Sequence, residues 1–416
     1  MSASAAPLPS ETTAPSGPTR ASERALAPDL ARGAMLLLIA LANCTFYLWA
    51  SPRGGISLHP VSDQLLDQIT QFLIITTVDM RTYPMFAFLF GYGVWQMYRR
   101  QAEAGVPERA ARRLLRRRNW WLIAFGFVHA LLLWVGDVLG AYGLAALVMV
   151  ALFLRRRDRT LITWASIMLG LLVTGALAAA VSAVFVAGLP APEGEAFSTA
   201  AFMAAPFATE SYPMSMLMRI AFWPFLVIGQ GLLGLVVPMV ILIAFWAARR
   251  GVLERPGDHL PLLRRTVIIG LTVGWLGGLP EALAQLGVLP IPDHVGWVFQ
   301  AVHPATGLFA GVAYVALFGL LAHRLSGTPA VTGLPVRALQ AVGQRSMSAY
   351  LAQSLICAPV LCAWGLGLGA HLGSATMALF AIGVWVITVL ACLLLARYRR
   401  RGPAEVLIRR LAYGKR

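Results

Sequence analysis

Charged residues are scarce in this chain. Asp, Glu, Lys and Arg make up 12% of its 416 residues, whereas apolar residues make up 58%, and the mean hydropathy is +0.70. A soluble globular domain has about 25% charged residues. The composition therefore excludes an ordinary soluble protein. It predicts a membrane protein, in which each spanning helix needs about 20 apolar residues.

Cysteine is also rare, and several other features are missing. The sequence has no convincing internal repeat, no soluble segment large enough to fold alone and no short charged start of a secretory signal. The four cysteines lie inside apolar segments without metal-ligand spacing, so we expect them to be small packing residues: Cys44, Cys357, Cys362 and Cys392. The sequence implies no metal site and no resident cofactor.

Ten apolar segments are long enough, or nearly so, to cross a membrane as helices. They cover residues 33–51, 79–98, 119–135, 138–154, 160–188, 219–248, 266–289, 298–322, 346–368 and 374–396. We therefore predict an all-α, polytopic bundle of about ten transmembrane helices. The predicted transmembrane domain is 29–398, between a disordered cytoplasmic tail at 1–28, rich in Ala, Ser, Pro and Thr, and a basic cytoplasmic tail at 399–416.

The basic residues fix the orientation of this bundle. Of the 34 Lys and Arg residues, 31 fall into alternate gaps between the apolar segments, and only Arg53, Arg81 and Arg219 remain for the other side. Basic residues mark cytoplasmic loops, so both termini are predicted to be cytoplasmic. Topology thus accounts for the high pI without nucleic acid as a partner. The basic loops are expected to contact anionic lipid headgroups, and Arg53 is expected to be an exposed loop residue.

Two segments depart from a plain spanning helix. Residues 62–78 are amphipathic and are predicted to lie along the outer membrane interface, because a full crossing there would invert every later loop. The segment 219–248 contains Pro224, Pro238 and three glycines. Proline removes a backbone hydrogen bond, so this helix is expected to kink or break, with a cavity beside it as one interpretation.

Polar residues at membrane depth are costly and therefore mark functional sites or buried ion pairs. Here they gather in the outer half of the predicted helices. His129 has no local partner on its apolar helix, and Asp137 follows at a short turn, so this pair is our candidate for acid–base catalysis. The candidates for substrate binding are Asp79, Arg81, Gln353, Arg219 and Tyr142. The competing interpretation is that the charged residues form ion pairs that join helices.

Arginines also gather at the cytoplasmic rim. Arg32 opens the first helix, Arg345 opens the ninth, and Arg113 and Arg117 precede the third. Together they predict a site for a phosphorylated cytosolic ligand such as a nucleotide-bearing thioester. Alternatively, each arginine serves only as a topological signal and a contact for anionic lipid.

Several motifs in a fixed order resemble a known family. They are DLARGAMLLLIALAN at 29–43, RTYPMFAFLFGYG at 81–93, GFVHALLLWVGDVLGAYG at 126–143, VGQRSMSAYLAQSLI at 342–356 and GPAEVLIRRLAYG at 402–414. On these residues the chain resembles the YeiB-like bacterial membrane proteins, a family named only as a domain of unknown function. The resemblance covers nearly the whole chain after residue 28 and implies a multi-pass protein of the bacterial cytoplasmic membrane.

This family is distantly similar to integral membrane acyltransferases, including those that acetylate heparan glucosamine or cell-surface polysaccharides. The similarity implies that a cytosolic acyl-CoA docks on Arg32, Arg345 and the arginines of 112–118. His129, oriented by Asp137, would then serve an extracytoplasmic hydroxyl or amine of a glycan or lipid acceptor, as a general base or a transient acyl acceptor. In the heparan enzymes the working histidine follows the first helix, which makes His59 a rival to His129.

Two other functions stay open at this point. A transporter or exporter of a small amphiphilic solute would explain the broken sixth helix and the embedded charges, although the sequence shows no second broken helix to pair with it. A non-catalytic sensor or assembly partner would leave the polar residues a structural role. The acyltransferase hypothesis makes a geometric prediction, because His129, Asp137, Arg81 and Gln353 should then converge in one cavity. The oligomeric state is not indicated.

Overall fold

The computed structural model of the protein describes residues 25–190 and 199–414, and within them it is all-helical, as predicted. Each of the ten predicted segments falls on a helix or on an interrupted helix. The α-helices are α1 (Leu26–Ala42), α2 (Cys44–Tyr47), α3 (Leu65–Thr77), α4 (Thr82–Glu103), α5 (Glu108–Leu132), α6 (Val138–Phe153), α7 (Asp158–Ala187), α8 (Thr199–Ala208), α9 (Tyr212–Ile228), α10 (Val236–Arg249), α11 (Leu260–Gln285), α12 (Val298–Leu325), α13 (Leu334–Gly343), α14 (Ser346–Leu361), α15 (Ser374–Arg397) and α16 (Pro403–Tyr413).

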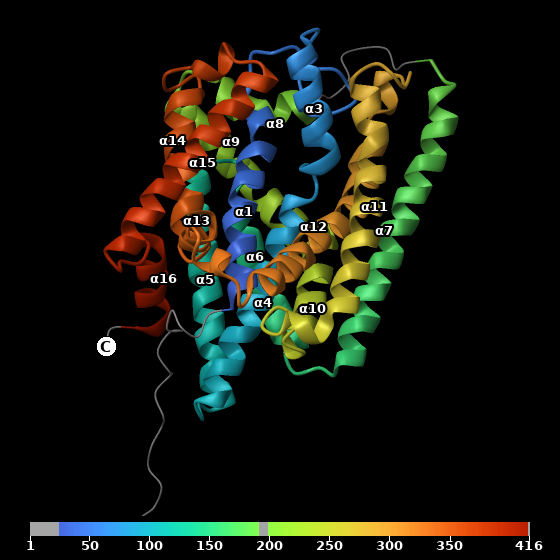
Figure 1. Ribbon diagram of the computed structural model, residues 1–416. Helices are drawn as coiled ribbons and strands as arrows, with labels where there is room; N and C mark the ends of the chain where they lie inside the picture. Colours follow the sequence, from blue (N-terminus) through green and yellow to red (C-terminus); the bar gives the residue numbers. More distant parts are fainter. Residues whose placement is uncertain (1–24, 191–198, 415–416) are drawn as a thin grey trace, which may run out of the picture.

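The long helices stand side by side in one bundle (Figure 1). Within the described residues, seven segments are long and apolar enough to cross a membrane, and α6, α10 and α14 are shorter apolar helices. The start of α1, the α4–α5 turn, the α10–α11 turn and α16 lie at the same end of the bundle (Figure 1). We call this the basic end, because the arginine-rich loops are there, and the other the far end. The positive-inside rule predicts that the basic end faces the cytoplasm.

The second span is built from two helices. Figure 1 shows α3 toward the far end and α4 continuing toward the basic end, and together they form one candidate span, Leu65–Glu103. The prediction that residues 62–78 lie along the interface is therefore wrong. The polar face of α3 is satisfied inside the protein, since Gln71 Nε2 donates to Ser374 Oγ (2.8 Å) and Asp67 Oδ1 accepts from the Ala375 N–H (2.8 Å). Because α3 and α4 make a single crossing, the later loops keep their predicted sides.

The predicted interruption of the sixth span is confirmed. Its α9 ends in a π-helical turn, Gly229–Leu233, before α10 begins. Met80 at the α3–α4 break has φ 57° and Leu235 at the α9–α10 break has φ 59°, and Arg399 is the one other non-glycine residue with positive φ in the described part of the chain. Such a backbone costs about 1–3 kcal/mol and is typically kept at functional sites. The described part of the chain thus has a break at α3–α4 besides the break at α9–α10 that the sequence indicated, and α4 packs against α10.

Each of the two predicted tails contains residues that are helical in the structure. Helix α1 starts at Leu26, and residues 1–24 of the predicted amino-terminal tail lie outside the described part of the chain. The predicted basic tail at 399–416 contains α16, which packs against α5 and α14. Glu405 fixes α16 in place, because its Oε1 accepts from the Met347 N–H (2.8 Å) and the Ser348 N–H (3.1 Å) at the start of α14.

A glycine lets the amino-terminal helix pack closely against a neighbouring helix. Helix α1 packs on α13, and a Cβ added at Gly33 would overlap the backbone oxygen of Leu339. Small residues let membrane helices approach this closely. We expect Gly33→Ala to lower the free energy of unfolding by about 1–3 kcal/mol, because the backbones would have to separate.

The matched control for this prediction is Gly170→Ala in α7, where an added Cβ meets no atom within 4 Å. It should leave stability unchanged or raise it by up to about 1 kcal/mol, since alanine favours a helix over glycine. Reversible unfolding in lipid–detergent mixtures measures both variants. Equal effects of the two substitutions would contradict the close crossing.

Candidate functional site

Two cavities enter the bundle from opposite ends. The basic-end cavity has a volume of about 620 Å³ and lies among α1, α4, α5, α14 and α16. The far-end cavity has a volume of about 870 Å³ and lies beside the breaks in both interrupted spans. Each volume is in the range of a small-molecule site. The cavities and the residues around them therefore form the candidate functional site.

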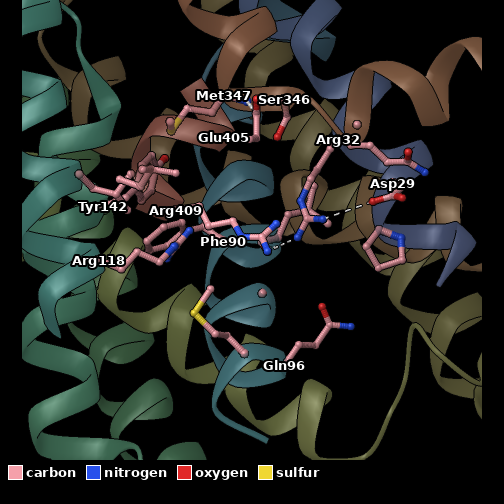
Figure 2. Close-up of a pocket in the computed structure, with 18 of the residues that line it drawn as sticks. Asp29, Arg32, Phe90, Gln96, Arg118, Tyr142, Ser346, Met347, Glu405 and Arg409 are labelled. Atoms are coloured by element: carbon pink, nitrogen blue, oxygen red, sulfur yellow. Dashed lines mark hydrogen bonds and ion pairs between the residues drawn. The ribbon is translucent and has the colours of Figure 1, made fainter. Parts of the chain in front are cut away.

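Arginines face the basic-end cavity, and Figure 2 shows Arg32 and Arg118 with their guanidinium groups in it. Arg32 lies 3.6 Å from the Asp29 carboxylate and donates to the Leu89 backbone oxygen (3.1 Å). Arg118 lies over the Phe90 ring, 5.4 Å from its centroid, and its buried Nη1 has no hydrogen-bond partner among the described residues. A buried donor on a cation without a partner favours an anionic ligand at this position.

A wall of aromatic side chains separates the two cavities. Phe86, Tyr142 and Tyr350 line both of them. The Phe86 and Tyr142 rings pack with their centroids 4.7 Å apart, and the Tyr142 hydroxyl donates to the Tyr83 backbone oxygen (2.7 Å). Tyr142, predicted to bind substrate, thus lies at the boundary between a cavity open to one end and a cavity open to the other.

The far-end cavity contains a histidine–carboxylate pair. His59, on the loop between α2 and α3, places its Nε2 2.7 Å from Asp79 Oδ2 at the α3–α4 break. Both residues line the cavity, and His59 is only 4% exposed. If Nε2–H donates to Asp79, the other ring nitrogen, Nδ1, carries a lone pair that can accept a proton. This arrangement is typical of a general base held by a carboxylate.

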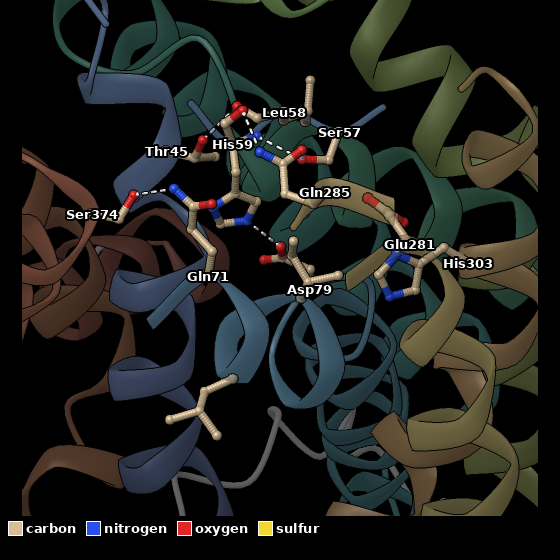
Figure 3. A network of polar contacts seen from close by, with 12 residues as sticks. Thr45, Ser57, Leu58, His59, Gln71, Asp79, Glu281, Gln285, His303 and Ser374 are labelled. Carbon is tan, nitrogen blue, oxygen red and sulfur yellow. Dashed lines mark hydrogen bonds and ion pairs between the residues drawn. The ribbon is translucent and has the colours of Figure 1, made fainter. Parts of the chain in front are cut away.

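Hydrogen bonds from several neighbouring residues hold the loop that carries His59 (Figure 3). Thr45 Oγ1 donates to the Leu58 backbone oxygen (2.6 Å), and Gln285 Nε2 donates to the Pro60 oxygen (3.1 Å). Arg53 was expected to be an exposed loop residue, but it is half-buried and its guanidinium donates to backbone oxygens of residues 45 and 48. Burial lowers the pKa of Arg53 to about 10, so it stays charged at neutral pH. The loop is therefore a preorganised support for His59.

A second polar group lies beside this pair. Arg81 is fully buried and donates to His303 Nε2, while His303 Nδ1 contacts Glu281 Oε2. The Arg81 guanidinium also donates to the Ile75 backbone oxygen (3.0 Å) and to that of Gly274. Arg81 thus satisfies carbonyl groups at the α3–α4 break and, through His303, compensates the Glu281 carboxylate. His303 and Glu281 line the far-end cavity, but Arg81 does not.

The predicted catalytic pair, His129 and Asp137, forms but lies elsewhere. His129 Nδ1 is 2.9 Å from Asp137 Oδ1, and Asp137 Oδ2 caps α6 by accepting from the Gly140 N–H (2.8 Å). Both residues are buried, and neither lines one of the two cavities. The His129 ring packs against Tyr350 (5.2 Å between centroids), and its Nε2 has no partner among the described residues. The pair joins the end of α5 to the start of α6.

Other predicted substrate-binding residues join helices as well. Arg219 is fully buried, donates to the Leu131 backbone oxygen (3.0 Å) and packs over the Trp364 ring. Gln353 donates to the Leu36 backbone oxygen (3.2 Å) between α14 and α1. Neither residue lines a cavity. The predicted convergence of His129, Asp137, Arg81 and Gln353 in one cavity is therefore not found.

Of the arginines predicted to bind a cofactor, some line a cavity and others do not. Arg32 lines the basic-end cavity. Arg345 does not, and it donates instead to the Arg400 backbone oxygen (2.6 Å) and the Ala341 oxygen (3.0 Å). Arg113 and Arg117 are exposed outside the cavity, whereas the neighbouring Arg118 lines it. The predicted group of arginines thus contains two residues that line the cavity, Arg32 and Arg118, and the sequence did not distinguish Arg118 from its neighbours.

Comparison with known proteins agrees with this architecture. Residues 247–415 match the family described as "Protein of unknown function (DUF418)". The chain is 25% identical over 406 residues to the uncharacterized protein YeiB of Escherichia coli (strain K12), covering 94% of this chain and 96% of YeiB. It is 26% identical over 424 residues to the uncharacterized protein YxaH of Bacillus subtilis (strain 168), covering 95% and 96% of the two chains. The chain is thus a distant, full-length homologue of YeiB and YxaH, and its carboxy-terminal part matches the DUF418 family.

Proposed function

We propose that this protein is an acyltransferase of the bacterial cytoplasmic membrane. It would carry an acyl group from a cytosolic acyl-CoA to a hydroxyl or amine on the extracytoplasmic side. One observation carries the proposal: an arginine-lined cavity at the basic end and a far-end cavity holding a His–Asp pair share one aromatic wall. A thioester arm crossing that wall would bring the acyl carbon from the cytoplasmic side to a general base on the other side.

In this proposal His59 acts as the base. The acceptor O–H or N–H gives its proton to His59 Nδ1 while the acceptor atom attacks the thioester carbonyl carbon. The C–S bond then breaks, the acyl group stays on the acceptor, and the CoA thiolate leaves toward the basic end, where it takes a proton from water. Asp79 holds the ring through Nε2 and stabilises the imidazolium. His129 remains the alternative base, and it would require Tyr350 to move aside.

The basic-end cavity would hold the phosphates of CoA. Arg118 offers an unpaired donor there, and Arg32 provides a second positive charge from α1. The acids that also line this cavity have partners of their own. Asp29 lies 3.6 Å from Arg32 and Glu103 lies 3.4 Å from Arg99, while Glu254 accepts from Gln96 Nε2 (2.8 Å) and Glu405 from the start of α14. Phosphate recognition by arginine is typical of such a site.

A matched pair of variants tests the donor site. Arg118→Ala should weaken CoA binding by about 10- to 100-fold, because a charge-assisted hydrogen bond contributes about 1.5–3 kcal/mol. Arg113→Ala, on an exposed part of the same helix, should bind CoA like the wild type. Titration of the purified protein with CoA by calorimetry measures both. No detectable CoA binding by the wild type, or equal loss in both variants, would contradict the donor site.

The activity itself is tested with radiolabelled acetyl-CoA. Membrane vesicles containing the protein should transfer label to an alkyl glycoside or to extracted lipid, whereas vesicles without it should not. The Arg118→Ala protein should need a correspondingly higher acetyl-CoA concentration. Absence of transfer over a panel of hydroxyl and amine acceptors, with CoA binding intact, would reject an acyltransferase in favour of a CoA-binding regulator.

Transport of a small amphiphilic solute is the second candidate function. The observation that favours it is the pair of interrupted spans, α3–α4 and α9–α10, which break beside the same far-end cavity. Interrupted helices line the substrate sites of many transporters. Solute flux into proteoliposomes that contain no CoA would support transport, and an absolute requirement for acyl-CoA would support transfer.

A further inference from the structure

The far-end cavity is open sideways toward the membrane. Leu171 in the middle of α7 and Leu233 at the α9–α10 break both line this cavity, yet they are 58% and 72% exposed on the molecular surface. An exposed side chain at mid-depth of a spanning helix faces the hydrocarbon of the bilayer. The wall formed by these two leucines is therefore in contact with lipid rather than with water.

The packing of the helices explains this opening. Helix α7 packs against α10 and α12, and among the described helices it has no extended interface with α9. Figure 1 shows α7 at the edge of the bundle. The cavity residues that face this gap are apolar on both sides, with Leu172 and Ala176 on α7 and Leu226 on α9. Apolar chains would lie here without exposing any polar protein group.

The interior of the same cavity is polar. His59 and Asp79 form its inner wall. Gln230, at the α9–α10 break, has a buried Oε1 without a hydrogen-bond partner among the described residues. A buried amide oxygen of this kind favours a ligand that donates a hydrogen bond, such as a hydroxyl or an amine. The cavity thus combines an apolar side opening with a polar interior.

We propose that the acceptor is an amphiphile that enters this cavity sideways from the bilayer between α7 and α9. Its apolar chain would stay at the gap lined by Leu171 and Leu233, while its hydroxyl- or amine-bearing head would reach Gln230 and the His59–Asp79 pair. The identity of the reaction rests on the proposed acyl transfer. The route of access rests on the cavity alone.

A photolabelling experiment tests the route without requiring activity. The full-length protein in phosphatidylcholine vesicles is irradiated with dodecyl glucoside carrying a diazirine on its sugar, or with methyl glucoside carrying the same group. Mass spectrometry then reads the label on residues 43–46, of which Asn43, Thr45 and Phe46 line the cavity. The dodecyl probe should label this segment about tenfold more than the methyl probe, because its chain concentrates it in the bilayer.

Two glycine variants on α7 provide a matched comparison. Gly175 lines the cavity and Gly170 does not, and an added Cβ meets no atom within 4 Å at either position. Gly175→Trp should lower labelling of residues 43–46 about tenfold by obstructing the gap, whereas Gly170→Trp should label like the wild type. The comparison of the two probes on the wild type needs no variant, so it holds even where a substituted protein fails to fold.

The outcomes separate this inference from the proposed reaction. Equal labelling of residues 43–46 by the methyl and dodecyl probes would overturn it in favour of a water-soluble acceptor. Labelling confined to the outer faces of α7 and α9, or unchanged by Gly175→Trp, would also overturn it. Dodecyl-selective labelling without transfer of label from acetyl-CoA would uphold the side opening and reject the acyltransferase.

Discussion

His59→Ala is expected to lower acyl transfer by about 10²–10⁴-fold, the usual contribution of a general base. The side chain lines the far-end cavity and is held by Asp79, so its removal takes away the proton acceptor. CoA binding should stay unchanged, because the arginines of the basic-end cavity lie beyond the aromatic wall. Initial rates with labelled acetyl-CoA at saturating donor, together with calorimetric CoA affinity, measure the two effects separately.

Asp79→Asn refines this prediction. The amide would keep the size of the side chain but no longer stabilise a positively charged ring, so turnover should fall while CoA affinity stays the same. Wild-type turnover in Asp79→Asn would contradict the role of Asp79 in holding the base, whereas a loss of CoA affinity would indicate a general structural defect.

The matched control is His129→Ala. Its partner Asp137 is fully buried, so removing the ring should destabilise the protein by about 3–5 kcal/mol, the cost of breaking a buried pair. Transfer per folded molecule should remain close to that of the wild type, because His129 lines neither cavity. The reverse pattern, with His129→Ala inactive and His59→Ala active, would return the role of base to the pair that the sequence favoured.

The gathering of the arginine-rich loops at one end of the bundle was predictable, because it depends on charges that act one by one. Each arginine resists translocation by itself, so their count between apolar segments predicts which end faces the cytoplasm. The break between α9 and α10 was predictable for a similar local reason, since Pro224 and the glycines beside Gly229 interrupt helical hydrogen bonding wherever the helix packs. Properties carried by a residue and its immediate neighbours could be inferred from the sequence.

The α3–α4 break was not predictable in this way. No proline or glycine lies between Ile75 and Arg81, and the backbone turns at Met80 because Arg81 satisfies carbonyls from α3 and from α11. One signal was present, since Gly274 and Gly278 stand four residues apart on α11, where Gly278 leaves room for the guanidinium and Gly274 lets α11 approach Ala310 of α12. That spacing also occurs at ordinary helix contacts, so it did not point to an arginine.

The choice of His59 over His129, and of Arg118 over its neighbours, was not predictable for related reasons. His59 lies on an irregular loop whose position comes from contacts with Thr45 and Gln285, more than two hundred residues apart in the chain, and no local pattern encodes them. Arg118 follows Arg117 by one residue, which turns it about 100° around the helix. To choose between Arg117 and Arg118, one must know which face of the helix lines the cavity, and the sequence alone does not show this.

Arg81→Met is expected to lower the free energy of unfolding by about 3–5 kcal/mol, because it leaves the Glu281–His303 pair without its compensating charge and removes donors from carbonyls at the break. The control Arg113→Met, on an exposed surface, should stay within about 0.5 kcal/mol. Unfolding in lipid–detergent mixtures measures both variants.

The double variant decides why Arg81 matters. If Arg81 compensates Glu281 through His303, then Glu281→Gln should remove part of the penalty, and the double variant should be more stable than the sum of the two single losses by about 1–3 kcal/mol. If Arg81 acts only on the backbone oxygens of Ile75 and Gly274, the two losses should add. A purely additive result would therefore confine Arg81 to holding the α3–α4 break, whereas coupling would show that Arg81 also supports, through His303, the charged wall of the far-end cavity.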